Sequence, residues 1–245
     1  MTFSDLINQG ILGVYMGPGN TLSGSAFAFL FFAGYLFCIV SGYLLGSINS
    51  AIIVSKLKFG SDIRTSGSGN AGMTNVLRTY GKAPAAMTLG GDAAKTLIAY
   101  ILGTLVFGIR GAYFACFMCV VGHVFPIFYR FRGGKGIVCA ATMILFLDPL
   151  TFLILFAVFV IVFFGYKYVS LASIMAAMIY PIAHTWMMIY IPSRAWTTST
   201  LFAVLTATLV LWRHYPNMKR LLDRTESKID IAKLFGRKKN DEDKK

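Results

Sequence analysis

The feature that most constrains this chain is a series of long apolar stretches separated by short polar segments. An α-helix crosses the hydrocarbon core of a bilayer with about 20 mostly apolar residues, and several stretches reach that length. Only 13% of the 245 residues are charged and 56% are hydrophobic. Soluble chains carry about a quarter charged residues, so this composition excludes an ordinary soluble domain. We expect an all-α, polytopic membrane helix bundle.

Seven transmembrane helices are expected. Asp148-Pro149 divides one apolar run, which is interpreted as a turn between two short helices, although one kinked helix would also fit. Gly42 and Gly46 form a G-x-x-x-G pair that permits close helix approach, within the bundle or in a dimer. A five-helix bundle has the same parity and stays an alternative. The expected helices lie near 27–55, 84–108, 112–129, 136–147, 149–166, 168–190 and 198–215.

The positive charges predict the orientation of this bundle. Of the 23 Lys and Arg residues, only Arg110 and Arg194 fall in loops on one side, and Lys95 lies inside a helix. Because cytoplasmic loops carry an excess of Lys and Arg, the N-terminus is expected outside and the C-terminus in the cytoplasm. The other basic residues fall in the segments 56–82, 130–135, 167 and the C-terminal tail.

Three regions follow from these assignments. Residues 1–26 are expected to form an extracytoplasmic extension, and residues 227–245 a mixed-charge cytoplasmic tail whose last part, 237–245, is disordered. Residues 27–220 form the membrane domain, with cytoplasmic motif loops at 56–83, 130–136 and 214–226. The cysteines at 38, 116, 119 and 139 lie among apolar residues without histidine at metal-ligand spacing, so neither disulfides nor a zinc site is expected.

The first motif loop contains a glycine-rich segment, residues 67–78. Glycines allow the backbone to turn successive N–H groups toward one point, and hydroxyl, amide and guanidinium side chains add further donors. This pattern favours a phosphate cradle over a flexible Gly/Ser linker. The candidate residues are Gly67, Ser68, Gly69, Asn70, Gly72, Thr74, Asn75 and Arg78.

The second loop contains Gly133, Gly134, Lys135 and Gly136 at the expected start of a helix. Free N–H groups, the positive end of the helix dipole and an ammonium group together suit an anion. The spacing of a nucleotide-binding P-loop is absent, so nucleotide is not implied. Lys135 is the favoured phosphate ligand, whereas His123 is interpreted as a core histidine.

The third segment contains His214 and Asn217, three residues apart and able to share a helix face. Histidine is a candidate for proton transfer near neutral pH, and a polar cluster that anchors the tail to lipid is the alternative. Two pairs lie within the expected helices. Asp92 and Lys95 are interpreted as a structural ion pair, and Ser170 and Ser173 could bond to their own backbone or to a bound anion.

Taken together, the segments resemble the PlsY family of bacterial acylphosphate-dependent glycerol-3-phosphate acyltransferases. The resemblance covers roughly residues 27–230. It rests on Gly-Ser-Gly-Asn-x-Gly-x-Thr-Asn-Val-x-Arg at 67–78, Gly-His-x-Phe-Pro followed by Gly-Gly-Lys-Gly within 122–136, and His-x-x-Asn-x-x-Arg-Leu ending in Thr-Glu at 214–226. It implies a seven-helix enzyme of the bacterial cytoplasmic (inner) membrane with a cytoplasmic active site.

The resemblance also implies a reaction. A fatty acyl group passes from acyl phosphate to the 1-hydroxyl of sn-glycerol 3-phosphate, which gives lysophosphatidic acid and phosphate in the first step of phospholipid synthesis. An acyl-phosphate-forming enzyme is then a functional partner, and neither a cofactor nor a metal is needed. The implied catalytic residues are Ser68, Arg78, Lys135, His214 and Asn217, with Ser173 on phosphate and with Arg220 and Glu226 interpreted as structural.

The mechanism expected from this resemblance is direct attack of the hydroxyl on the acyl carbonyl. The proton passes either to His214 or to the phosphate of the donor, and Ser68 as a covalent nucleophile is the alternative. Without the resemblance, a phosphate transporter and a noncatalytic lipid-binding scaffold would be the rival classes. The charge pattern gives no sign of nucleic-acid binding.

Overall fold

The computed structural model describes residues 2–17, 19, 20, 22–190 and 196–229. Arg194 and the tail segment 237–245 lie outside the described residues. The regular elements within this part of the chain are all helical, as predicted. They are α1 (Phe3–Tyr15), α2 (Gly24–Ser47), α3 (Ser50–Phe59), η1 (Ile63–Thr65), α4 (Met73–Tyr80), α5 (Lys82–Val124), η2 (Ile127–Tyr129), α6 (Ile137–Leu147), α7 (Pro149–Tyr166), α8 (Val169–Tyr190), α9 (Trp196–Arg213) and α10 (Tyr215–Leu222).

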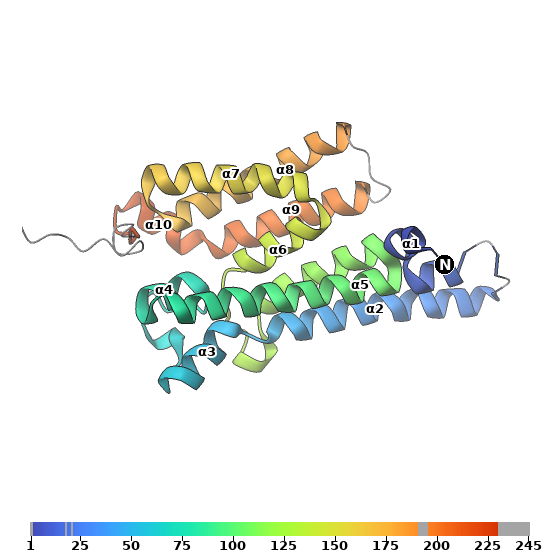
Figure 1. Cartoon of the computed structure of the whole chain (residues 1–245), viewed down its shortest axis with the longest axis horizontal. Helices are drawn as coiled ribbons and strands as arrows, with labels where there is room; N and C mark the ends of the chain where they lie inside the picture. The colour runs from blue at the N-terminus through green and yellow to red at the C-terminus, as the bar shows by residue number, and fades with distance from the viewer. Residues whose placement is uncertain (1, 18, 21, 191–195, 230–245) are drawn as a thin grey trace, which may run out of the picture.

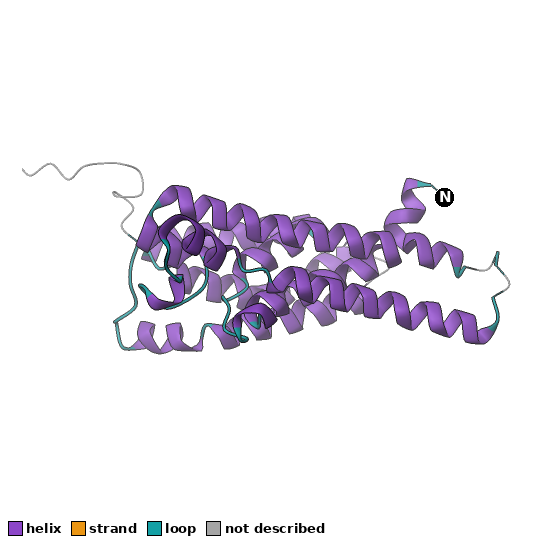
Figure 2. Ribbon diagram, turned by 90° about the horizontal axis from the view of Figure 1, so that it is seen from below, coloured by secondary structure: helices purple, strands orange, loops and turns teal. Residues whose placement is uncertain are grey.

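The long helices run side by side as a bundle with two layers (Figures 1 and 2). One layer holds α2 and α5, the other holds α7, α8 and α9, and α6 connects them. The short helices α3, α4 and α10 gather at one end of the bundle, and α1 lies at the other end (Figure 1). The three motif segments of the sequence therefore meet at a single end.

The outer surface of the bundle is apolar. Phe29 is 71% exposed, Ile161 72% and Ile182 69%, on three different helices. Such a surface is stable in lipid, and helices satisfy their own backbone groups there. Among the described residues, four helical stretches are long and apolar enough to cross a bilayer, namely Gly24–Phe59, Lys82–Tyr129, Pro149–Tyr166 and Val169–Tyr190. The structure thus supports the prediction of an all-α membrane protein.

Several boundaries differ from the sequence-based assignment. The stretch expected as one helix over 27–55 ends at Ser47, and Asn49 caps α3 by accepting a hydrogen bond from the Ile52 N–H at 3.1 Å. The segment 56–83, expected as a loop, contains α4 as well as the end of α3. The helix α6 has 11 residues, which correspond to about 16 Å, or half a bilayer core. The expected break at Asp148-Pro149 is present.

A tight turn at Phe107 and Gly108 divides α5 into two arms. Gly108 has a φ of +59°, which a residue with a side chain rarely adopts. The arms return alongside each other, because a Cβ atom on Gly103 would overlap the backbone of Gly111. These arms correspond to the expected helices 84–108 and 112–129.

Close backbone contacts join α2 to the second arm of α5. A Cβ atom on Gly46 would overlap the carbonyl oxygen of Cys119, and one on Gly42 would overlap that of Ala115. A Cβ atom on Gly122 would in turn overlap the carbonyl oxygen of Tyr43. The G-x-x-x-G pair of the sequence therefore packs within the molecule.

The expected N-terminal extension contains a helix, α1, which packs against the turn of α5. Gly10 interrupts α1 with a φ of +69°, and its backbone lies directly against that of Gly108. The capping box at the start of α1 pairs Thr2 with Asp5. This contact explains why two glycines stand at facing positions.

A buried polar cluster that the sequence analysis did not identify joins α7, α8 and α9. The Asp148 carboxylate caps α7 and lies 2.7 Å from Nδ1 of His184, whose Nε2 lies 3.0 Å from the Ser199 hydroxyl. The order of the three groups matches a hydrolase triad. His184 is fully buried, however, so a substrate could not reach it. The cluster therefore serves to hold the helices together.

Candidate active site

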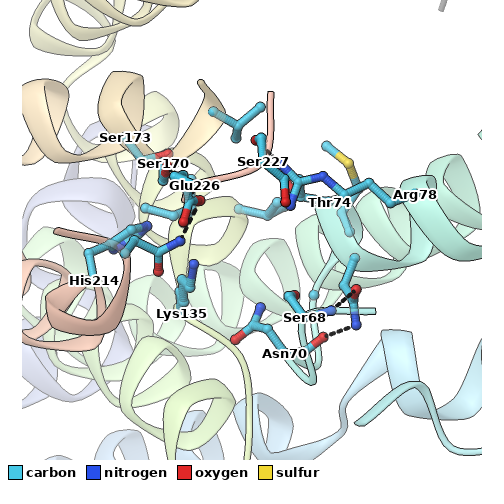
Figure 3. A pocket seen from close by; sticks show the side chains of 18 of the residues that line it. Ser68, Asn70, Thr74, Arg78, Lys135, Ser170, Ser173, His214, Glu226 and Ser227 are labelled. Atoms are coloured by element: carbon cyan, nitrogen blue, oxygen red, sulfur yellow. Dashed lines mark hydrogen bonds between the residues drawn. The ribbon is translucent and has the colours of Figure 1, made fainter. Parts of the chain in front are cut away.

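The three motif segments line one pocket of about 150 Å³ at the end of the bundle that holds α4 and α10 (Figure 3). The pocket brings together side chains separated by up to 159 positions in the sequence, from Ser68 to Ser227. The predicted residues that line it are Ser68, Asn70, Gly72, Thr74, Asn75, Arg78, Asp92, His123, Lys135, Gly136, Ser170, Ser173, His214, Asn217, Arg220 and Glu226.

Asn75 organises the first glycine-rich loop. Its Oδ1 accepts the backbone N–H of Ser68 at 2.9 Å, and its Nδ2 donates to the carbonyl oxygens of Ser66 and Asn70 at 2.9 and 3.1 Å. Gly67 has a φ of +58°, and a Cβ atom there would overlap Asn75 Oδ1. Asn75 is therefore committed to holding the loop, whereas Ser68 and Asn70 present their side chains to the pocket.

The helix α4 starts at this loop without a side-chain cap. Gly72 is its N-cap residue and cannot satisfy the first N–H groups, and Met73 and Thr74 line the pocket. Unsatisfied N–H groups and the positive end of a helix dipole favour a bound anion. Because the segment 56–83 is expected as a loop from its sequence, the dipole of α4 is a contribution that only the structure reveals.

The second loop leads into α6 in the same way. Gly136 is the N-cap residue of α6, with a φ of +78° and no capping side chain. The loop is held from outside, because the Arg213 guanidinium donates to the carbonyl oxygens of Gly134 and Gly133 at 3.3 and 3.5 Å. Two uncapped helix N-termini therefore border one pocket.

Lys135 projects from this loop into the pocket (Figure 3). Within the described part of the chain its ammonium group makes neither a hydrogen bond nor an ion pair. Burial lowers the pKa of Lys135 to about 8, the carboxylate of Glu226 opposes this shift, and the guanidinium groups of Arg220 and Arg78 reinforce it. A partly buried cation without a partner is well placed to bind an anionic ligand.

Glu226 holds the third segment together. It accepts hydrogen bonds from Ser170 and Asn217 at 2.8 Å and from Arg220 at 2.7 Å. Burial alone would raise the pKa of Glu226, but the hydrogen bonds from Arg220, Asn217 and Ser170 keep it below its usual value. The carboxylate is therefore ionised and holds Ser170, Asn217 and Arg220 together.

These contacts orient His214 and Asn217. The side-chain Nδ2 of Asn217 donates to Glu226, so Oδ1 is an acceptor. This oxygen is buried and has no hydrogen-bond partner among the described residues. His214 Nδ1 lies 2.8 Å from the carbonyl oxygen of Val210, which can only accept. The neutral ring therefore carries its proton on Nδ1 and keeps a lone pair on Nε2. The pair offers two acceptors to a hydroxyl group.

Arg78 closes the opposite wall. Its Nη2 donates to the carbonyl oxygen of Ser227 at 2.8 Å, so the segment after α10 crosses the pocket (Figure 3). We call residues 227–229 the strap. At its end, Ile229 donates its N–H to the carbonyl oxygen of Lys167 at 2.9 Å. Ser227 is not among the predicted site residues, because its contact uses the backbone and joins residues 149 positions apart.

The pocket lies between two other hollows. An apolar groove of about 470 Å³ shares Met73, Ile137, Val138, Phe159 and Ser173 with it and continues between α6, α7, α8 and α9. A basic basin of about 530 Å³ lies on its other side, lined among others by Arg64, Arg132, Arg213 and Arg220. An amphiphile in the groove and a small anion in the basin would meet at Lys135, which lines both the pocket and the basin.

Five predicted site residues do not line the pocket. Gly69 and Gly133 border the basin, whereas Gly67 and Gly134 hold the loop backbones against Asn75 and His123. Lys95 lies beneath the pocket, with its ammonium 2.9 Å from Asp92 Oδ1 and 3.0 Å from His123 Nδ1. The ion pair expected from the sequence is present.

Asp92, His123 and Cys139 come close enough to one another to hold a metal ion. The Lys95 ammonium already lies 2.9 Å from Asp92 Oδ1 and 3.0 Å from His123 Nδ1. A fixed positive charge is therefore already bound to two of the three residues of this group. The donor set does not fit a metal site.

Comparisons with known proteins agree with this geometry. A family model described as glycerol-3-phosphate acyltransferase matches residues 36–224. A glycerol-3-phosphate acyltransferase of Neisseria meningitidis serogroup C is 41% identical over 196 residues, which are 78% of this chain and 95% of that protein. One from Clostridioides difficile is 41% identical over 205 residues, covering 81% of this chain and 97% of that protein.

A solved structure is also similar. It is the crystal structure of PlsY, an integral membrane glycerol 3-phosphate acyltransferase, in its glycerol 3-phosphate form, with a TM-score of 0.73 and 32% sequence identity. The similarity covers 82% of this chain and 98% of that one. The family match begins after α1 and ends before the strap at Ser227. These matches and the apolar helices show that this chain belongs to the glycerol-3-phosphate acyltransferase family of membrane enzymes.

Proposed function

We propose that this protein transfers a fatty acyl group from acyl phosphate to the 1-hydroxyl of sn-glycerol 3-phosphate, giving lysophosphatidic acid and phosphate. The observation that carries the proposal is the position of Lys135 in a pocket between an apolar groove and a basic basin. The groove suits the acyl chain of the donor and the basin suits the soluble phosphate. The similar PlsY structures are described in a glycerol 3-phosphate form and a lysophosphatidic acid form.

In the proposed reaction the substrate hydroxyl attacks the acyl carbonyl carbon, and the bond from that carbon to the phosphate oxygen breaks. Lys135, Arg78 and the free N–H groups of α4 and α6 stabilise the charge that develops on the leaving phosphate. Asn217 Oδ1 accepts from the glycerol hydroxyl groups. No covalent intermediate is needed, because a mixed anhydride is already activated.

Two acceptors compete for the proton of the attacking hydroxyl. His214 Nε2 has a free lone pair in the neutral ring, and the phosphate of the donor carries its own acceptor oxygens. A rate near wild type in His214→Ala would exclude the histidine as general base. Ser68 as a nucleophile is the second mechanism, and trapping of an acylated Ser68 by intact-mass spectrometry would support it.

The test of the function uses purified protein in detergent with palmitoyl phosphate and labelled glycerol 3-phosphate, without metal or nucleotide. Lysophosphatidic acid and phosphate should appear in equal amounts. The reaction should vanish in Lys135→Ala and persist in Lys58→Ala, which alters an exposed lysine of α3. Turnover with acyl-CoA or acyl carrier protein alone would contradict the donor. Uptake of glycerol 3-phosphate into proteoliposomes without turnover would favour a transporter.

We also propose a multi-pass topology in the bacterial cytoplasmic membrane, with the motif end of residues 27–220 in the cytoplasm and residues 1–26 outside. In this proposal α2, the two arms of α5, α6, α7, α8 and α9 are the seven membrane helices. An acyl-phosphate-forming enzyme on the cytoplasmic side would supply the donor. The one-sided gathering of the basic motif segments supports this orientation.

Thiol labelling can test the topology, because all four native cysteines are buried. A membrane-impermeant maleimide should label Ser4→Cys in intact spheroplasts and Lys58→Cys only after lysis. Labelling of Lys58→Cys in intact spheroplasts would reverse the orientation. The activity of each variant confirms that it is folded.

A further inference from the structure

The ammonium of Lys95 connects the two glycine-rich loops of the pocket without lining the pocket itself. Lys95 is 5% exposed and Asp92 is 1% exposed, so both charges are buried. Besides Asp92 and His123, the ammonium donates to the carbonyl oxygens of Gly46 and Ile48 at 3.0 and 2.7 Å. These carbonyls belong to the end of α2, where the helix stops and leaves them without helical partners.

One side of this network leads to the loop of residues 67–72. Asn49 directly follows the carbonyl of Ile48 that Lys95 binds. Its Nδ2 donates to the carbonyl oxygen of Ala71 at 3.3 Å, and its Oδ1 caps α3. Asn49 therefore connects the Lys95-bound backbone at Ile48 to the first loop.

The other side leads to the loop of residues 133–136. Nδ1 of His123 lies 3.0 Å from the Lys95 ammonium and 3.5 Å from Asp92 Oδ1, and Nε2 is the other nitrogen of this ring. The backbone of Gly134 packs against that Nε2, since a Cβ atom there would overlap it. The carbonyl oxygens of His123 and Val124 accept the N–H groups of Gly134 and Gly133 at 3.1 and 3.2 Å.

The two loops also approach each other above the network, because a Cβ atom on Gly134 would lie 2.7 Å from the carbonyl oxygen of Ala71. Lys95 thus bonds to the supports of both loops from beneath the pocket. An ion pair alone would need only Asp92. The contacts to α2 and His123 provide further acceptors for the buried ammonium, and they also connect it to two other segments of the chain.

We propose that Lys95 is a positioning residue for acyl transfer, which sets the spacing between the two phosphate-binding loops and so aligns the hydroxyl with the acyl carbonyl. The proposal rests on the function proposed above. A misplacement of about 1 Å at a reacting centre costs about 100-fold in rate. Loss of Lys95 should therefore lower kcat about 100-fold while each loop still binds its own phosphate.

The test uses the double variant Asp92→Asn/Lys95→Met, which removes both charges and leaves neither buried alone. Thr88→Val is the matched control, since Thr88 is buried on the same face of α5 and its hydroxyl donates to the Pro84 carbonyl oxygen of its own helix. Turnover of the wild-type protein, measured in parallel, establishes the proposed function independently. Binding of glycerol 3-phosphate alone is measured by calorimetry.

The expected result is a folded double variant with about 100-fold lower kcat, glycerol 3-phosphate affinity within about threefold of wild type, and an unchanged control. A kcat near wild type would show that Lys95 only neutralises Asp92 and would overturn the proposal. An equal loss of binding and turnover would also overturn it, because the pocket would then have collapsed.

If the double variant does not fold, the variant Lys95→Arg is used to test the positioning role of Lys95. Its guanidinium keeps the charge beside Asp92 but cannot reproduce the short bonds to both α2 carbonyls. A folded protein with at least tenfold lower kcat and retained binding supports positioning, and a wild-type kcat contradicts it. If this variant also fails to fold, Lys95 is a folding determinant and the proposal is wrong.

Discussion

The lowered pKa of Lys135 predicts an alkaline limit to activity. Only the charged ammonium binds phosphate strongly, and with a pKa of about 8 the charge is lost as the pH rises through 8. About 90% of the free enzyme is charged at pH 7 and about 10% at pH 9. Because kcat/KM reports the free enzyme, it should fall about tenfold between these pH values.

The variant Lys135→Arg should remove this limit, because a guanidinium stays charged throughout the range. Its kcat/KM will be lower at pH 7, since the larger group shifts the phosphate, but it should stay level up to pH 9. In the wild-type enzyme the kcat profile should lie at higher pH than that of kcat/KM, because bound phosphate stabilises the ammonium.

The assay follows lysophosphatidic acid from pH 6.5 to 9.5, with blanks without enzyme to correct for hydrolysis of acyl phosphate. Lys58→Arg, the same change at an exposed lysine, should keep the alkaline limit. If the limit near pH 8 is unchanged in Lys135→Arg, another group causes it, and the assignment of Lys135 as the phosphate-binding cation loses its support.

Three further outcomes are expected. Gly46→Ala should lower the free energy of unfolding by about 1–3 kcal/mol, because the added methyl group separates α2 from α5, whereas Gly165→Ala, where the added Cβ meets no atom within 4 Å, should not. His184→Ala should cost about 3 kcal/mol by leaving Asp148 buried without its partner, with kcat unchanged in the folded fraction. The stability of the Gly46→Ala and His184→Ala variants is measured in detergent with a thiol-reactive dye that reports exposure of the buried cysteines. A variant whose melting temperature equals that of the wild type would contradict its prediction. Asn217→Ala should raise KM for glycerol 3-phosphate about tenfold, because the buried acceptor is lost, and an unchanged KM would show that the substrate does not reach it.

The sequence predicted the helical membrane class and the grouping of the motif residues, because hydropathy, charge and glycine content are local properties. It also predicted the break between helices 84–108 and 112–129, which the structure has at Phe107 and Gly108. It could not predict the contact that stabilises this turn, because the partner is Gly10, nearly 100 positions away. The helix α4 was missed for a related reason. The segment that precedes it is rich in glycine, and the amphipathic stretch is only 8 residues long.

Polar contacts between residues far apart in the chain could not be predicted from the sequence either. The sequence identified Asp92 and Lys95 as a local pair, but not that the ammonium also binds the end of α2. His184 carried no signal, because a single histidine in an apolar helix reveals its partner only when Asp148 is brought beside it. The predicted hydroxyl of Ser170 faces Glu226, a contact between residues 56 positions apart.

Because of the backbone contacts at Gly42, Gly46 and Gly122, the layer of α2 and α5 is expected to be more rigid than the layer of α7, α8 and α9. Where main-chain atoms touch with no side chains between them, helices cannot slide or separate by rotamer changes, so α2 and α5 behave as a stiff plate. The described parts of α7, α8 and α9 contain one glycine, Gly165, and nothing fills its empty side-chain position. The motions that admit a long acyl chain should therefore occur in α7, α8 and α9, and thermal unfolding should begin in these helices.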